Sequence, residues 1–155
     1  MKYQPLLHIV LYEPEIPPNT GAVGRTCVAI GAKLWLVRPL GFQIDAKTRR
    51  RAGLDYWAHL EWEVCDQWAH LQERLANHRF WYFTKTATRS YLSAEYQTGD
   101  VLVFGSESTG IPSSVLTANA EHNLRIPLRP EVRSLNLSCA ASVAGYEALR
   151  QIAPQ

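Results

Sequence analysis

Residues 101–112 read VLVFGSESTGIP, and this stretch joins a buried-strand pattern to a tight turn. Its first four residues form a continuous apolar run, which predicts a strand buried on both faces. The turn that follows holds a carboxylate, Glu107, between Gly105 and Gly110, and it contains no lysine. Ligands bind at the carboxyl ends of strands in open α/β sheets, so this turn is predicted to hold a ligand.

Similar strand patterns recur along the chain, with helical patterns between them. Strands separated by helices favour an α/β fold, a mostly parallel sheet flanked by helices. The predicted strands are 6–12, 33–37, 80–83, 101–104 and 124–128. Helices are predicted after 17–19, over 45–51 and 65–77, after Pro112, and from a start near Ser134 or Asn136.

The first and last predicted helices carry apolar residues at helical spacing. In the first, Val23 and its neighbours one turn on share a face, and Gly31 suits a left-handed cap at its end. Arg25 lies about 200° from Val23 around the helix, so it is expected on the polar face. The last helix carries a long apolar stripe made of Cys139, Val143, Tyr146 and Leu149.

Composition indicates one compact domain covering residues 1–155. The chain has 155 residues, 46% hydrophobic and 19% charged, which is enough to bury a real core. No leader pattern and no run near the roughly 20 apolar residues of a membrane span are present, so a soluble, cytoplasmic protein is expected. The three cysteines and five histidines show no zinc-type spacing, so no metal is expected.

The charge pattern leaves two interpretations open. A net charge of +2 is too mild to indicate a nucleic-acid protein by itself. Lys47 and Arg49 to Arg51 form a basic cluster, and Arg125, Arg129 and Arg133 punctuate a later stretch. These residues fit either ordinary solvated charge or contact with a polyanion.

Several familiar chemistries lack their motifs here. There is no GxxxxGK[ST] phosphate loop, no GxGxxG dinucleotide turn and no GxSxG nucleophile elbow. What remains is three unusual loops, each after a predicted strand: YEPEIPPNTGAVGRTC at 12–27, FGSESTGIP at 104–112 and RIPLRPEVRSLNLSCAASV at 125–143. Serine and asparagine in the third loop also fit routine capping of a helix.

The motifs in these loops resemble those of the SPOUT superfamily. NTG at 19–21 with Arg25, FGSESTGIP at 104–112, and IPL at 126–128 with RSLNLS at 133–138 are similar to its three motifs. Within it, the chain resembles the short single-domain tRNA ribose 2′-O-methyltransferases that modify the wobble cytidine or uridine of certain leucine tRNAs. The resemblance covers nearly the whole chain, including PLGF at 39–42 and RRAGLDY at 50–56.

This resemblance implies a fold and a cofactor. It implies a deep C-terminal trefoil knot, which nothing in the hydrophobic pattern predicts. It also implies S-adenosyl-L-methionine as cofactor, tRNA as substrate and a homodimer in which the partner's first motif completes the site. The missing lysine fits a sulfonium-bearing nucleoside without a phosphate. Lys85, Arg89 and the 47–51 cluster are expected to contact tRNA.

The resemblance also assigns roles by position. Arg25 stays protonated, so it is expected to clamp a phosphate and stabilise negative charge rather than act as a base. Cofactor contacts are expected from Phe83, Thr84, Gly105, Glu107, Gly110, Ile126, Leu128, Ser134 and Leu135. The catalytic residues implied are Arg25, Ser134 and Asn136, and the substrate-binding residues are Asn19, Arg25, Arg133 and Tyr146.

One departure and three alternatives accompany this hypothesis. Thr109 stands where close relatives commonly have arginine, which bears on the range of RNA substrates. The first alternative is a knotted cofactor-binding protein that associates with RNA without catalysis. The second is a methyltransferase acting on another tRNA or rRNA ribose. The third, which the hydrophobic pattern alone allows, is an unknotted flavodoxin-like nucleotide binder.

Overall fold

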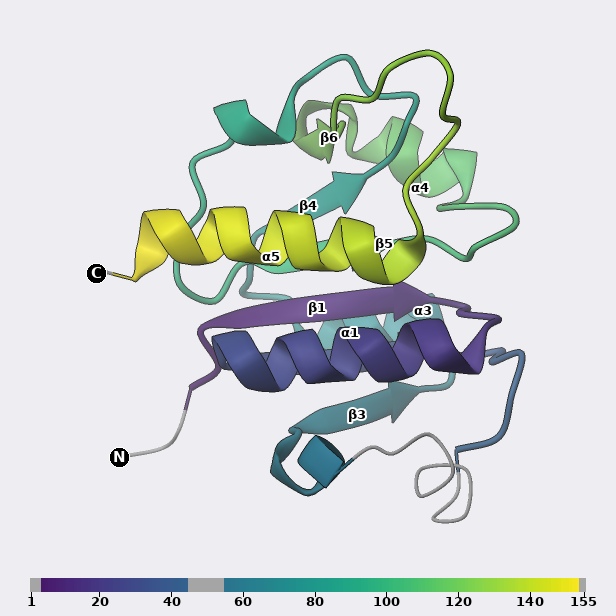
Figure 1. Cartoon of the computed structure of the whole chain (residues 1–155), viewed down its shortest axis with the longest axis vertical. Coiled ribbons are helices and arrows are strands. Elements are labelled where there is room, and N and C mark those ends of the chain that lie inside the picture. The colour runs from purple at the N-terminus through teal and green to yellow at the C-terminus, as the bar shows by residue number, and fades with distance from the viewer. Residues whose placement is uncertain (1–3, 45–54, 154–155) are drawn as a thin grey trace.

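The computed structural model describes residues 4–44 and 55–153 and places its strands in one sheet (Figure 1). The sheet has six strands in the order β3-β2-β1-β5-β4-β6, and every pairing between them is parallel. The predicted α/β fold with a mostly parallel sheet is therefore confirmed. The strands are β1 Leu7–Tyr12, β2 Ala32–Val37, β3 Trp62–Cys65, β4 Phe80–Phe83, β5 Val101–Phe104 and β6 Asn123–Leu124.

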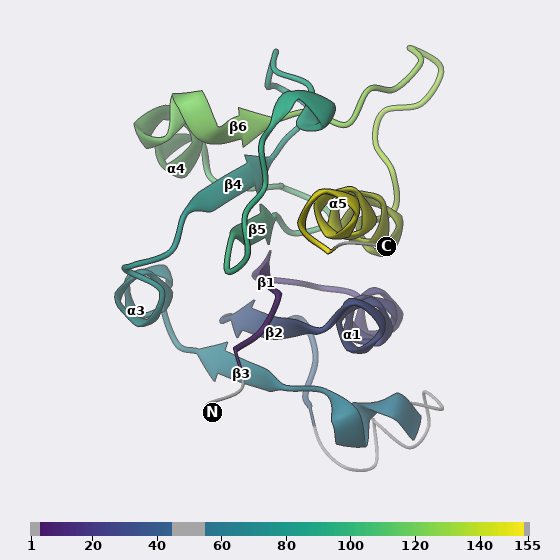
Figure 2. The same cartoon turned by 90° about the vertical axis from the view of Figure 1, so that its left-hand side faces the viewer.

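Helices cover both faces of the sheet (Figure 2). The long helices α1, Pro17–Ile30, and α5, Leu137–Ile152, lie on one face, and the short helices α3, Trp68–Arg74, and α4, Ser113–Ala118, lie on the other. Three 3-10 turns complete the described elements: η1 Asp55–His59, η2 Tyr91–Ser93 and η3 Ala120–His122. No helix in the described ranges is long and apolar enough to cross a membrane.

The core lies on both sides of the central strands. Leu7, Ile9 and Leu11 of β1 are fully buried in the cluster beneath α1 and α5, while Val10 belongs to the cluster on the opposite side. This double burial explains why the central strands are continuous apolar runs without alternation. Burial on both faces holds the central strands in place, so the loops at their carboxyl ends start from defined positions.

Three predicted elements begin or end more than one residue from the observed bounds. The first helix begins at Pro17 and not after residue 19, because proline is well tolerated in the first helical turn. The last strand ends at Leu124 and not at residue 128, because Pro127 has no backbone N–H to donate to a ladder. The predicted helix 65–77 is shorter, since Cys65 ends β3 and the helix covers 68–74. β3 itself was not predicted, because four residues with a glutamate among them give a weak strand pattern. The predicted helix 45–51 lies outside the described residues.

Three of the four residues in the predicted apolar stripe of α5, Cys139, Val143 and Tyr146, are exposed, and only Leu149 packs against the core. Val143 and Tyr146 are 38% and 51% exposed, whereas the buried face consists of Leu137, Ala141, Ala144, Gly145 and Ala148. Small residues on that face let α5 approach α1 closely: a Cβ atom on Gly145 would lie 3.0 Å from Cδ1 of Ile30. The larger apolar side chains are consequently left on the surface.

Candidate active site

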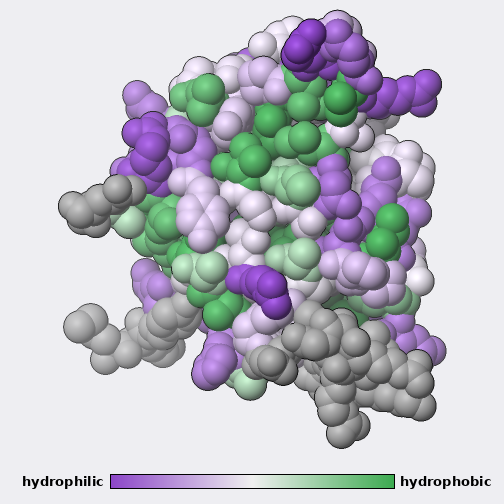
Figure 3. All heavy atoms as spheres, viewed as in Figure 1, coloured by the Kyte–Doolittle hydropathy of each residue, from purple (hydrophilic) through white to green (hydrophobic). Residues whose placement is uncertain are grey.

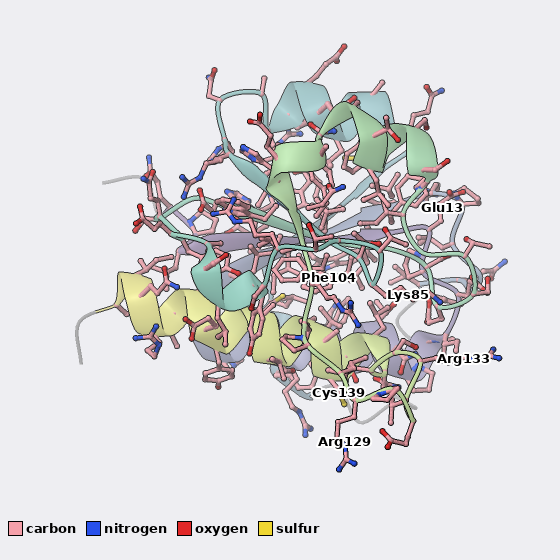
Figure 4. The ribbon with its side chains drawn as sticks, turned by 90° about the horizontal axis from the view of Figure 1, so that it is seen from above. Glu13, Lys85, Phe104, Arg129, Arg133 and Cys139 are labelled. Atoms are coloured by element: carbon pink, nitrogen blue, oxygen red, sulfur yellow. The ribbon has the colours of Figure 1, made fainter. Side chains whose placement is uncertain are left out.

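Loops that follow different strands meet at the carboxyl edge of the sheet. They are residues 13–16 after β1, 84–90 after β4, 105–112 after β5 and 125–136 after β6. Viewed from above, Glu13, Lys85 and Arg133 lie at the same end of the molecule, while Phe104 lies inside and Arg129 points outward (Figure 4). Parallel pairing brings these loops together, because all carboxyl ends share one edge.

The carboxylate of Glu107 caps α1 from a distant point of the sequence. Its oxygens accept hydrogen bonds from the backbone N–H groups of Glu15, at 2.9 Å, and Ile16, at 2.8 Å. No side chain of its own caps the N-terminus of α1, so Glu107 satisfies groups that would otherwise lack partners and places negative charge at the positive end of the helix. In return, the Glu15 carboxylate accepts hydrogen bonds from the backbone N–H and hydroxyl of Ser108, which lower the pKa of Glu15.

Asn19 joins the three sequence motifs into one hydrogen-bonded chain. Its amide nitrogen donates to Glu107 at 3.2 Å, and its amide oxygen accepts from the side-chain nitrogen of Asn136 at 3.0 Å. The Asn136 oxygen accepts from the backbone N–H of Ser138 at 2.8 Å and so caps α5. Asn136 therefore both caps α5 and links the third motif to the first. Its role as a helix cap and its role in the site do not exclude each other.

The turn 105–110 depends on both of its glycines. A Cβ atom on Gly105 would lie 2.1 Å from the carbonyl carbon of Gly110 and 2.2 Å from the nitrogen of Ile111, so no other residue fits without opening the turn. Gly110 has φ +70°, which glycine adopts without strain. The Thr109 hydroxyl lies 2.7 Å from the hydroxyl of Ser106. Thr109 thus contributes a contact within the turn.

Apolar side chains and unpaired backbone line the region next to this turn. Phe83 and Phe104 stack, with ring centres 4.7 Å apart and an angle of 16° between the planes. Ile126, Leu128 and Leu135 are half-buried. Within the described ranges, the backbone groups of residues 126 and 128 form no hydrogen bonds. Half-buried apolar side chains beside free backbone donors and acceptors suit a nucleoside, which has a flat apolar face and a polar edge.

A hollow of about 230 Å³ opens beside the third loop and adds a polar rim to this region. It is lined by Thr88, Ser90, Arg125, Pro127 and Leu128. The Thr84 backbone N–H donates to the carbonyl of Leu124 at 2.9 Å. This hydrogen bond joins the start of the loop after β4 to the end of β6. In the described part of the chain, no three His, Cys, Asp or Glu side chains come together in a way that could hold a metal ion.

Four predicted site residues lie apart from the hydrogen-bonded chain of Asn19, Glu107 and Asn136. Arg25 is exposed on α1, with its guanidinium 5.1 Å from the ring centre of Tyr56. Tyr146 is about 15 Å along α5 from Asn136, at 1.5 Å per residue. Arg133 and Ser134 are exposed and form no hydrogen bonds with other described residues.

Sequence reasoning gave no role to two residues that the structure brings into contact with the site. Glu15 binds the second motif, and Tyr56 contacts Arg25. Glu15 lies in the first of the three loops, YEPEIPPNTGAVGRTC, and Tyr56 lies in RRAGLDY, one of the stretches that carry the resemblance. The sequence contained no signal of either contact, since each joins segments distant along the chain.

Comparison with known proteins matches this geometry to one family. The model of the SpoU rRNA Methylase family matches residues 6–146. The tRNA (cytidine(34)-2′-O)-methyltransferase of Escherichia coli strain K12 is 45% identical over 148 residues, 95% of this chain and 94% of the relative. A solved structure described as giving insights into the 2-OH methylation of C/U34 on tRNA is 46% identical, with a TM-score of 0.86 over 94% of this chain and 95% of that chain.

A more distant structure shows the same fold with a cofactor. The AdoMet-bound rRNA methyltransferase of Sinorhizobium meliloti has a TM-score of 0.81 and 24% identity, over 96% of this chain and 61% of that chain. The resemblance noted in the three motifs is thereby confirmed, and this chain belongs to the SpoU rRNA Methylase family.

Proposed function

We propose that this protein is a tRNA (cytidine(34)-2′-O)-methyltransferase. It transfers a methyl group from S-adenosylmethionine to the ribose 2′-hydroxyl of the wobble nucleotide. The observation that carries the proposal is the 45% identity to a relative of this activity across nearly the whole length of both chains. The hydrogen bonds from Asn19 to Glu107 and Asn136 support it, because they bring residues of all three sequence motifs into contact with one another.

The cofactor is held at the carboxyl edge, between the turn 105–110 and residues 126–135. Backbone groups of Ile126 and Leu128 would hold the polar edge of its adenine, and Phe83 and Leu135 would supply apolar contact. Gly105 and Gly110 keep the turn compact, and Thr84 and Ser134 add polar contacts. When bound, S-adenosylmethionine supplies a methyl group on a positively charged sulfur. Glu107 acts on this site through the N-terminus of α1, to which its carboxylate is bound.

Residues of the chain must orient and activate a neutral hydroxyl, which is a poor nucleophile. The guanidinium of Arg25 binds the phosphate next to the target ribose and stabilises the negative charge that develops on the 2′-oxygen. The products are the 2′-O-methyl ether, S-adenosylhomocysteine and the proton of the hydroxyl, which is released to solvent. The Ser134 hydroxyl, which has no partner among the described residues, hydrogen-bonds the reacting groups. Asn136 is held by Asn19 and Ser138 and fixes the loop that carries Ser134. Alignment of hydroxyl and methyl group supplies much of the rate enhancement.

A homodimer completes the site. The outward face of α5 exposes Val143 and Tyr146, and hydrophobic and weakly polar residues predominate over α5 and α1 (Figure 3). Burying this face against a second copy removes apolar surface from water. The dimer brings Arg25 of one copy to the cofactor region of the other, which accounts for its separation from the loops of its own chain.

The tRNA lies along the carboxyl edge of the dimer. Exposed basic residues at this edge, Lys85, Arg125, Arg129 and Arg133, bind its phosphates without reading sequence. Specificity for leucine isoacceptors comes from nucleotides of the anticodon loop. This substrate implies a cytoplasmic location. We also propose that the C-terminal segment is threaded as the trefoil knot of the SPOUT fold, which is supported by the structural likeness to a relative of 46% identity.

Incorporation of labelled methyl groups tests this proposal against its alternatives. The protein is expected to methylate leucine tRNA transcripts and not rRNA fragments, and S-adenosylhomocysteine is expected to raise its melting temperature. Binding of S-adenosylhomocysteine without methyl transfer to any RNA would favour a non-catalytic protein. A rise in melting temperature with FMN alone would indicate a flavodoxin-like binder.

A further inference from the structure

The guanidinium of Arg25 lies over the ring of Tyr56. Its central carbon lies 5.1 Å from the centre of the Tyr56 ring, inside the roughly 6 Å at which a ring face attracts a cation. No side chain among residues 4–44 and 56–153 forms a hydrogen bond or ion pair with it. Among these residues, Tyr56 is the one whose ring contacts the guanidinium.

Tyr56 is itself fixed to the helix that carries Arg25. Its hydroxyl donates a hydrogen bond to the backbone carbonyl of Gly21 in α1. In an α-helix that carbonyl also accepts the backbone N–H of the residue four positions later, which here is Arg25. The phenol is thus attached one helical turn before Arg25, on the same side of the helix as its guanidinium.

The turn that carries Tyr56 packs tightly on α1. A Cβ atom on Gly24 would lie 3.0 Å from Cζ3 of Trp57 and 3.2 Å from Cδ2 of Leu60. Trp57 is buried, with its ring centre 5.3 Å from that of Trp62 in an edge contact. Glycine at position 24 allows η1 to lie this close to α1, so Tyr56 is presented from a rigid support.

We infer that Tyr56 is a positioning residue for catalysis and that its ring orients the guanidinium of Arg25 toward the substrate. This inference rests on the proposed function, in which Arg25 binds the substrate phosphate and stabilises the reacting oxygen. An arginine side chain is long and loses much rotamer freedom when it is ordered. When the Tyr56 ring orders the Arg25 side chain before the substrate binds, less conformational entropy is lost on reaching the transition state.

Substitutions of Tyr56 separate this role from a structural one. Tyr56→Leu removes the ring and the hydroxyl, and it is expected to lower kcat about tenfold. Tyr56→Phe keeps the ring and is expected to stay within about threefold of the wild type, since it loses the bond to Gly21 alone. His59→Ala, at the other end of η1, is the matched control and should leave kcat unchanged. Steady-state methyl transfer to tRNA gives kcat and KM, calorimetry gives S-adenosylhomocysteine affinity, and thermal unfolding gives Tm.

A positioning role requires that kcat falls in Tyr56→Leu while cofactor affinity and Tm stay near the wild-type values. Unchanged kcat in Tyr56→Leu would overturn the inference. So would a loss of kcat that is matched by losses of cofactor affinity and Tm, because that is the signature of a structural residue. A Tyr56→Phe enzyme as slow as Tyr56→Leu would assign the effect to the hydroxyl and overturn the role of the ring. If the wild-type protein methylates no tRNA, the proposed function itself fails, whereas an active wild type with a fully active Tyr56→Leu enzyme refutes this inference alone.

Discussion

Gly105 is the residue at which the geometry leaves least freedom. Because a Cβ atom would lie 2.1 Å from backbone of the same turn, Gly105→Ala must open the turn. We expect S-adenosylhomocysteine affinity to fall about tenfold or more in a calorimetric titration. The matched control is Gly31→Asn, at a position outside the turn with φ +77°, where the nearest atom to the added Cβ would be Cβ of Leu6 at 3.9 Å. Asparagine tolerates this conformation, so near-normal binding is expected there. Normal binding by Gly105→Ala would refute the placement of the cofactor beside this turn.

A substitution of Glu107 tests whether the hydrogen-bonded chain of Asn19, Glu107 and Asn136 stabilises the folded protein. Glu107→Gln leaves one acceptor oxygen and turns an amide donor toward N–H groups that already donate. The expected cost is about 1 to 2 kcal/mol, or roughly 3 to 6 °C in Tm for a chain of this size. The comparison is Glu121→Gln, since the Glu121 carboxylate is exposed and forms no hydrogen bond with described residues. Equal melting temperatures for the two variants would contradict the capping role of Glu107.

At the scale of elements, the end of the sheet opposite the site holds a buried histidine, His8 of β1, whose ring contacts a tryptophan of β2. His8 is 5% exposed, and its Nδ1 accepts a hydrogen bond from Nε1 of Trp35 at 3.0 Å. Burial, together with the nearby charges of His78 and Lys33, lowers the pKa of His8 to about 4. The folded state therefore resists protonation at this site.

This lowered pKa predicts a loss of stability in mild acid. Below the unfolded pKa of 6.5 the unfolded chain binds a proton that the folded chain does not bind until about pH 4. The free energy of unfolding should thus be highest above pH 6.5 and fall toward pH 4 by at most about 3 kcal/mol. His8→Gln should remove most of this slope in urea unfolding measured at several pH values, while exposed His59→Gln should keep it. A slope unchanged by His8→Gln would show that other groups cause it.

The sequence predicted those elements whose patterns are local. The buried runs of β1, β4 and β5 and the cap at Gly31 were predicted because one short window contains the whole signal. β3 was not predicted because its four residues give a weak strand pattern, and the strand is stabilised by its pairing with β2. The direction of the α5 stripe was not predictable, since which face of a helix is buried depends on what packs against it. The contacts of Glu107 and Tyr56 were not predictable either, because each depends on which segments pack together. The knot stays a prediction from the resemblance.

At the scale of the whole molecule, the outward face of α5 predicts the assembly state. Val143→Glu places a charge on this face at a side chain that is 38% exposed, and desolvating it in an interface is costly. Sedimentation velocity should show a dimer for the wild type and a monomer for Val143→Glu. Leu92→Glu, at a 56% exposed position in η2, is the matched control and should remain dimeric. A dimer that survives Val143→Glu would exclude this face as the interface.

The central claim is methyl transfer to the 2′-oxygen of the wobble nucleotide, and mapping the modified position tests it most directly. A leucine tRNA transcript is incubated with protein and labelled S-adenosylmethionine, then digested and analysed by mass spectrometry, beside a transcript that carries a 2′-deoxynucleotide at position 34 alone. One methyl group is expected on the ribose of nucleotide 34 in the first transcript and none in the second. Methylation of the deoxy transcript at the same level, or of any base, would contradict the central claim.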